Sequence, residues 1–227
     1  MMELPEESDL GCPPDKVEAD VHNVFREGIS QVPEEAPDST ERAVQKLRDV
    51  EGLREENWQQ LDEPGRRAVL NAAGREVADV FRQPAPPLHI EDMHDPSLRG
   101  TYGDGFRSGV DGELEGSDYR ISMNSEGLNP GEGVLGDDPR PALQTYLHEF
   151  RHGYQHEQIA RFEKPQFQNL VDNRELAEEW SRNDKDYQRP EAGYESYYDQ
   201  PLESDARDFA AQITGRLFSE PDDPGKR

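Results

Sequence analysis

Three histidines stand four residues apart in the segment TYLHEFRHGYQHEQ (residues 145–158), and a glutamate directly follows the first of them. On an α-helix, which turns about 100° per residue, His148 and His152 lie about 40° apart, so their rings point from successive turns towards one place. This H-E-x-x-H spacing supplies two nitrogen ligands to zinc. The carboxylate of Glu149 can then accept a proton from a zinc-bound water. The segment therefore predicts a zinc site with His148 and His152 as ligands and Glu149 as the catalytic base.

The motif requires a helix, and the surrounding residues predict one. Asp138 with the nearby prolines provides a helix start, and no proline follows Pro141 as far as Phe162. Apolar residues recur at helical spacing and form one stripe, which consists of Leu143, Tyr146, Leu147, Phe150 and Tyr154. The competing interpretation is a charged surface helix that is merely rich in histidine. The apolar stripe favours the metal site.

The third histidine of the segment does not fit the same ion. His156 stands about 80° round the helix from His148 and a further turn along, so one unbroken helix cannot direct all three rings at one point. The extended metzincin pattern places its third histidine six positions after the second, beyond a glycine turn, whereas here Gly153 follows His152 at once. We therefore expect His156 to lie beside the ligands or on the surface.

A second helix is predicted to supply the third ligand. Pro201 stands in its first turn, and its apolar face consists of Leu202, Ala206, Phe209, Ala210, Ile213 and Leu217. Glu203 and Asp205 both lie at its beginning. A carboxylate from either position would complete a site of two histidines and one acid, with a fourth position left for water, as in catalytic zinc sites.

The two segments HEFRHGYQ and PLESDARDFA together resemble the compact gluzincin-type zinc metallopeptidases, which include small bacterial and phage forms and toxin-associated peptidase domains. These carry H-E-x-x-H on one helix and E-x-x-A on the next. The resemblance covers about residues 86–218. It implies an α+β, zincin-like fold, Glu149 as general base, and a zinc ion held by His148, His152 and Glu203.

The match to the second motif is direct, because Glu203 is followed three residues later by Ala206. Some gluzincins carry an aspartate four residues after the ligand glutamate. Arg207 occupies that place here, so the role of that aspartate is unfilled or passes to Asp208.

Patterns along the chain predict four parts. We expect a disordered acidic tail over residues 1–15, a helical region over 16–85, the zincin-like metallopeptidase domain over 86–218 and a disordered tail over 219–227. The helical region would hold helices over residues 16–30, from Thr40 towards Leu53, and between Pro64 and Pro84. The sequence leaves open whether this region is an inhibitor, a targeting arm or part of the fold.

A small mixed sheet is expected between the helical region and the motif helix. Leu88 and Ile90 alternate with polar residues, and RGTYG and DYRISMN read as two further strands. In DYRISMN every second residue is apolar, which predicts a half-buried strand at the edge of the sheet, packed on the motif helix.

The composition narrows the classes of partner. The chain has 227 residues, a net charge of −25 and 32% hydrophobic residues, against about 45–50% in typical domains. Such a surface repels phosphate groups, so we expect neither nucleic acid nor an anionic membrane as a partner. There is no apolar run of membrane-spanning length and no signal-peptide pattern at the N-terminus. We expect a cytoplasmic protein, or one exported by a specialised secretion system.

The predicted reaction is hydrolysis of a peptide bond in a protein or peptide substrate, by a toxin, an effector or a regulatory protease. An edge strand could pair with an extended substrate. The developing oxyanion needs a second donor besides zinc, and the candidates are Tyr194, Tyr197, Tyr198 and His156. Two alternatives remain open: a catalytically silent, acidic protein-binding module of the same fold, and an acidic mimic of nucleic acid.

Overall fold

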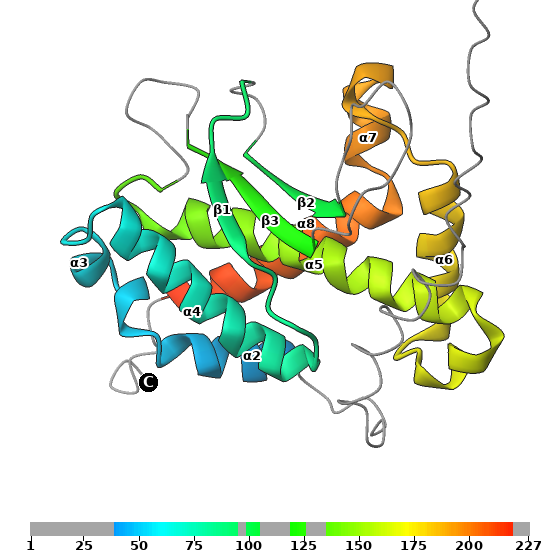
Figure 1. Ribbon diagram of the computed structural model, residues 1–227, viewed down its shortest axis with the longest axis horizontal. Helices are drawn as coiled ribbons and strands as arrows, with labels where there is room; N and C mark the ends of the chain where they lie inside the picture. Colours follow the sequence, from blue (N-terminus) through cyan, green and yellow to red (C-terminus); the bar gives the residue numbers. More distant parts are fainter. Residues whose placement is uncertain (1–38, 95–98, 105–118, 126–134, 220–227) are drawn as a thin grey trace, which may run out of the picture. The chain divides into compact units, whose positions relative to one another are not determined.

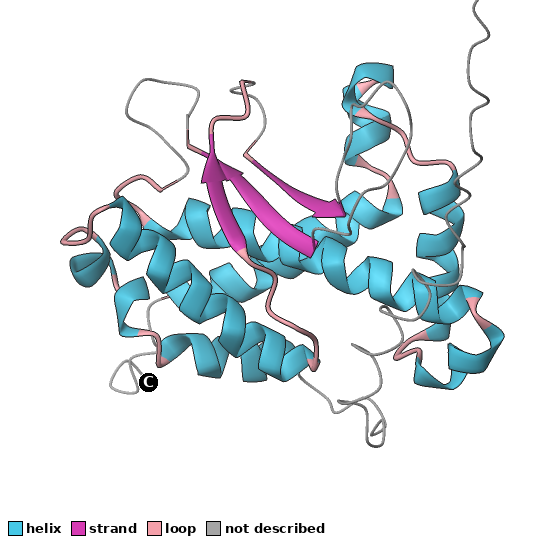
Figure 2. Ribbon diagram, in the orientation of Figure 1, coloured by secondary structure: helices cyan, strands magenta, loops and turns pink. Residues whose placement is uncertain are grey.

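The computed structural model describes residues 39–94, 99–104, 119–125 and 135–219. They form a mixed α and β structure that is mostly helical, with one small three-stranded sheet (Figures 1 and 2). This confirms the predicted α+β class. The predicted tail over 1–15, the predicted helix over 16–30 and all of the predicted C-terminal tail except Ser219 lie outside the described residues.

The described part begins with a group of helices: α2 (Ser39–Arg48), the 3₁₀ turn η1 (Glu51–Leu53), the short α3 (Glu55–Trp58) and α4 (Glu63–Phe81). The side chain of Asp62 caps α4 by accepting a hydrogen bond from the Gly65 N–H at 3.0 Å. The helix predicted from Thr40 towards Leu53 is shorter than expected. It ends at Arg48, and Val50, with φ −82° and ψ 86°, separates it from η1.

The sheet consists of β1 (Leu88–Glu91), β2 (Gly100–Asp104) and β3 (Tyr119–Asn124), in the order β1-β3-β2. β1 pairs with β3 in parallel, and β2 pairs with β3 antiparallel. The prediction that residues 119–124 form an edge strand is therefore wrong, because β3 is the central strand. The polar Ser122 and Asn124 are buried like their apolar neighbours, and Asn124 accepts a hydrogen bond from the Met93 N–H at 3.3 Å.

The remaining elements are α5 (Pro139–Glu163), η2 (Pro165–Leu170), α6 (Arg174–Lys185), η3 (Pro190–Ala192), α7 (Tyr194–Tyr198) and α8 (Pro201–Phe218). α5 and α8 confirm the two predicted helices. α6 was not predicted, although Asn173 caps it by accepting from two backbone N–H groups and Ala177 and Trp180 form its buried face. None of the described helices is both apolar enough and long enough to cross a membrane.

One hydrophobic core joins the early helices to the motif helix. α2 packs on α8 and α4, α4 packs on α5, and the sheet lies along α5 (Figure 1). The centre of this core consists of Val44, Leu47, Leu70, Val77, Ile121, Met123, Leu143, Leu147, Phe150 and Ile213. Of the roles left open for residues 16–85, the described portion from Ser39 onwards is part of the fold and supports the helices that carry the motifs.

The contact between α4 and α5 gives a prediction about stability. The Tyr146 side chain is 1% exposed, and its hydroxyl has no hydrogen-bond partner within the described residues. Tyr146→Phe removes a buried, unsatisfied hydroxyl, so we expect the free energy of unfolding to stay constant or rise by about 1 kcal/mol. A Cβ at Gly74 would lie 1.9 Å from the Tyr146 hydroxyl. Gly74→Ala should therefore lower the free energy of unfolding by about 1–3 kcal/mol. Urea unfolding of both variants measures this, and a loss above about 1 kcal/mol in Tyr146→Phe would show that the hydroxyl has a partner.

Candidate metal centre

The three predicted ligands lie together. The Nε2 atoms of His148 and His152 are 3.1 Å apart, and the Glu203 carboxylate lies 3.3 Å from the first and 3.5 Å from the second. One ligand atom from each of the three residues lies within 4.8 Å of the others. In the described ranges no other group of histidine, cysteine and acidic side chains converges in this way. These residues could hold a metal ion.

The packing of α8 against α5 places Glu203 in the site. Ala206 is fully buried, and its small side chain suits the close packing of α8 against α5; in Figure 1, α8 passes behind α5. The Glu203 side chain is buried, whereas Asp205, two residues further on, points to a different side of α8. Asp205 forms an ion pair with Arg151 at 2.7 Å instead of facing the imidazoles, and Asp208 is exposed. Of the two acids left open, Glu203 is therefore the one that lies at the site.

Glu149 lies under β2 and is 6% exposed. The backbone N–H of Tyr102 donates to its carboxylate. A Cβ at Gly100 would stand 3.2 Å from Oε1 of Glu149 and 2.8 Å from Thr145, so the strand passes directly over the motif. Burial raises the pKa of the Glu149 carboxyl, and the two histidines partly offset this. A carboxylate with a raised pKa is suited to accept and return a proton near neutral pH.

Both β2 and β3 contact the motif helix α5, but the edge strand among them is β2, where the sequence predicted DYRISMN. The Asn124 N–H donates to the Arg99 carbonyl at 2.9 Å. In an antiparallel pair only every second residue of a strand hydrogen-bonds to the partner strand. The backbone groups of Gly100 and Tyr102 therefore point away from β3. The Tyr102 ring packs on Gly153, where a Cβ would lie 2.7 Å from a ring carbon. Gly153, directly after the second ligand, thus lets the outer edge of β2 lie along the site.

Burial, neighbouring charges and hydrogen bonds shift the pKa values of His152 and Glu203. Burial lowers the pKa of His152, but the hydrogen bond to Glu203 and the charges of Glu149 and Glu203 outweigh it and raise this pKa to about 9. Burial alone would raise the pKa of Glu203, but hydrogen bonds from His148 and His152 hold it well below its usual range. Because a metal binds the neutral imidazole, binding must displace a proton from His152 below pH 9. Metal affinity is therefore expected to rise with pH up to that value.

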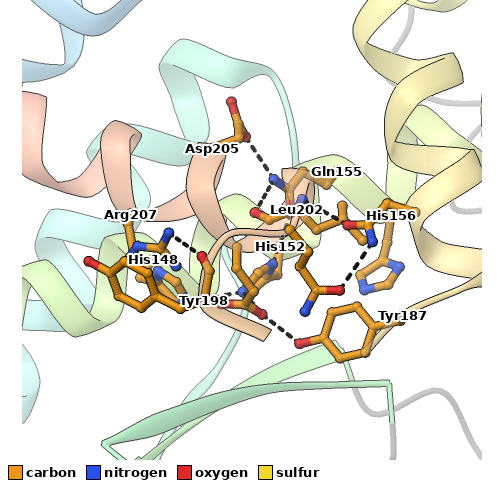
Figure 3. A network of polar contacts seen from close by, with 12 residues as sticks. His148, His152, Gln155, His156, Tyr187, Tyr198, Leu202, Asp205 and Arg207 are labelled. Atoms are coloured by element: carbon orange, nitrogen blue, oxygen red, sulfur yellow. Dashed lines mark hydrogen bonds and ion pairs between the residues drawn. The ribbon is translucent and has the colours of Figure 1, made fainter. Parts of the chain in front are cut away.

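A tyrosine that the sequence did not single out contacts the ligand carboxylate. Tyr187, from the turn after α6, donates its hydroxyl to Oε1 of Glu203 at 2.5 Å (Figure 3). Burial, together with the hydrogen bond to Glu203, raises the pKa of Tyr187, so it stays protonated and remains a donor. No local pattern marks this residue, because it reaches the site from an irregular turn.

The four predicted oxyanion donors are placed differently. Tyr197 lies beside Tyr187, with ring centres 6.3 Å apart, and burial and the charge of Glu203 raise its pKa. Tyr194 is 67% exposed and stacks on Tyr198. His156 is exposed and stacks on Tyr102, as expected for a residue that does not bind the ion. Of the four, Tyr197 is the one whose pKa is raised by burial and by the charges of Glu203 and Glu149.

No protein-family model, no curated protein and no solved structure matches this chain. The resemblance to gluzincin-type peptidases therefore rests on the motif residues alone. Two imidazole nitrogens and one carboxylate are a donor set that fits zinc, and the same set with a fourth, water-filled position is found in catalytic zinc sites.

Proposed function

We propose that this protein is a zinc-dependent peptidase of the gluzincin type. The observation that carries the proposal is the meeting of His148 and His152 from α5 with Glu203 from α8, next to a carboxylate that is not a member of this group. A structural zinc site would be closed by four protein ligands. Within the described ranges three ligands converge beside an adjacent base, and this arrangement supports a hydrolytic role instead.

The residues of the chain have separate roles in the proposed reaction. When bound by the three side chains, zinc would activate a water molecule and polarise the scissile carbonyl. Glu149 accepts the proton of the attacking water and then delivers it to the leaving amine, for which its raised pKa is suited. Tyr187 holds the Glu203 carboxylate, and Tyr197 is the favoured donor to the oxyanion.

The substrate is proposed to be an extended segment of a protein or peptide. β2 is an outer strand of the described sheet, and the backbone groups of Gly100 and the carbonyl of Tyr102 face away from β3, while the Tyr102 N–H donates to Glu149. An extended chain can pair with such an edge through its own backbone, which positions a peptide bond without fixing its side chains. Selectivity would then depend on the side chains around α7 and β2.

The proposal is tested with a mixture of peptides from a digested proteome. We expect the zinc-loaded protein to generate new peptide termini detectable by mass spectrometry, a chelator to stop this, and added zinc to restore it. Loss of cleavage on chelation separates the activity from a contaminating serine or cysteine protease. Zinc bound at one equivalent with no cleavage of any peptide would instead favour the catalytically silent binding module.

A further inference from the structure

Gln155 lies between the two helices that carry the ligands. It is fully buried and follows His152 by three residues on α5. Its Oε1 lies 2.9 Å from Nδ1 of His152, and its Nε2 lies 2.9 Å from the Leu202 carbonyl and 2.7 Å from Asp205 (Figure 3). All the polar atoms of this amide are therefore used, towards one ligand and towards the turn of α8 that carries another.

These partners determine the orientation of the Gln155 amide and, through it, the tautomer of His152. The Leu202 carbonyl and the Asp205 carboxylate are both acceptors, so the group facing them must be the NH₂ of Gln155. Its oxygen then faces His152 and can only accept, which places a hydrogen on Nδ1 of the ring. The neutral ring consequently has its lone pair on Nε2, the atom directed at His148 and Glu203.

Asp205 is itself held in place. Arg151 donates to both of its carboxylate oxygens, at 2.7 and 3.0 Å. The guanidinium lies over the rings of Tyr154 and Phe209 at 4.7 and 5.0 Å and is thus fixed by packing as well as by charge. A continuous set of contacts therefore runs from Arg151 through Asp205 and Gln155 to His152, and it crosses from α5 to α8 and back.

From this geometry we infer that Gln155 is a positioning residue for the metal centre. It fixes the tautomer of His152 that can bind a metal through Nε2. It also links the Leu202–Asp205 turn, which carries Glu203, to α5 by hydrogen bonds. A neutral amide does this without adding charge, whereas a glutamate at this place would lie against the carboxylate of Asp205. The inference rests on the proposed metal site and does not depend on peptidase activity.

The same helix offers a matched control. Gln158 is 1% exposed and makes two hydrogen bonds: it donates to the Asp172 carboxylate at 3.0 Å and accepts from the Asp172 N–H at 2.9 Å. Neither contact reaches a ligand. Loss of this side chain removes two hydrogen bonds of a buried amide on α5, against three on loss of Gln155, and both lie away from the ion.

The test compares Gln155→Leu with Gln158→Leu in the full chain. Zinc affinity is measured by competition with a chromogenic chelator, and geometry by the visible absorption of the cobalt-loaded protein. Loss of a group that orients a ligand typically lowers metal affinity about 10–100-fold. We expect such a loss and a changed cobalt spectrum for Gln155→Leu, and an affinity within about threefold of wild type with an unchanged spectrum for Gln158→Leu.

Stability is measured in parallel by urea unfolding of the metal-free proteins. Both variants should unfold at a lower urea concentration than wild type, because each loses buried hydrogen bonds. If Gln155→Leu does not fold, Gln155→Met, which keeps an unbranched chain of similar length, replaces it. Equal zinc affinities and spectra in the Gln155 and Gln158 variants would overturn the inference. Zinc binding by wild type without cleavage would refute the peptidase and leave the role of Gln155 standing, whereas no zinc binding by wild type would overturn both.

Discussion

Replacement of Glu149 by glutamine is expected to abolish peptide hydrolysis and to leave zinc bound. An amide cannot accept the proton of the attacking water, and general-base catalysis typically contributes about 10²–10⁴-fold to the rate. Glu149 does not belong to the group of three ligand residues, so its neutral counterpart should retain the ion. The measurement is the initial rate of cleavage of a fluorogenic peptide, together with the zinc content of the same sample.

Glu157→Gln is the matched control for this variant. Glu157 lies two turns further along α5, where it pairs with Arg161 and contacts none of the ligands. Its replacement makes the same chemical change on the same helix and should leave the rate within about twofold, since it lies outside the reacting groups. Cleavage by zinc-loaded Glu149→Gln at a rate near that of wild type would show that another group activates the water.

Replacement of Glu203 by alanine should have the largest effect on metal binding. Three side chains share the binding of the ion, so loss of one is expected to lower zinc affinity by at least about 100-fold. The change also removes the acceptor of the Tyr187 hydroxyl and the principal hydrogen-bond partner that raises the pKa of His152. Chelator competition at fixed pH measures the affinity.

The control for Glu203→Ala is Asp208→Ala, which removes the same charge from the same helix at an exposed position. Its zinc affinity should equal that of wild type. If Glu203→Ala binds zinc as tightly as Asp208→Ala, the third ligand is another group, and the meeting of α5 and α8 would have no role in metal binding.

The sequence predicted best what depends on neighbours along one helix. His148, Glu149 and His152 follow from four-residue spacing, and the apolar stripes of α5 and α8 follow from the helical period. Glu203 lies far along the chain, and only the resemblance distinguished it from Asp205. In the structure Asp205 pairs with Arg151 and so does not face the imidazoles, and no sequence pattern indicates this ion pair.

Errors arose where tertiary packing decides. The alternation in DYRISMN was interpreted as a half-buried edge strand, but β1 and β2 pair with this strand on both sides, and its polar Ser122 and Asn124 are buried. Gln155 was within reach of sequence reasoning, because a residue three positions after His152 lies on the same face of the helix. Tyr187 was not, since its position depends on how the turn after α6 packs against α8.

The most direct test of the account is the metal content of the purified wild-type protein beside His148→Ala. After incubation with zinc at micromolar concentration and removal of the excess, elemental analysis should find one equivalent in wild type and less than about one tenth of that in the variant, because one of three ligands is lost. If wild type retains no zinc, or if His148→Ala retains as much as wild type, the imidazole pair and Glu203 do not form the metal centre.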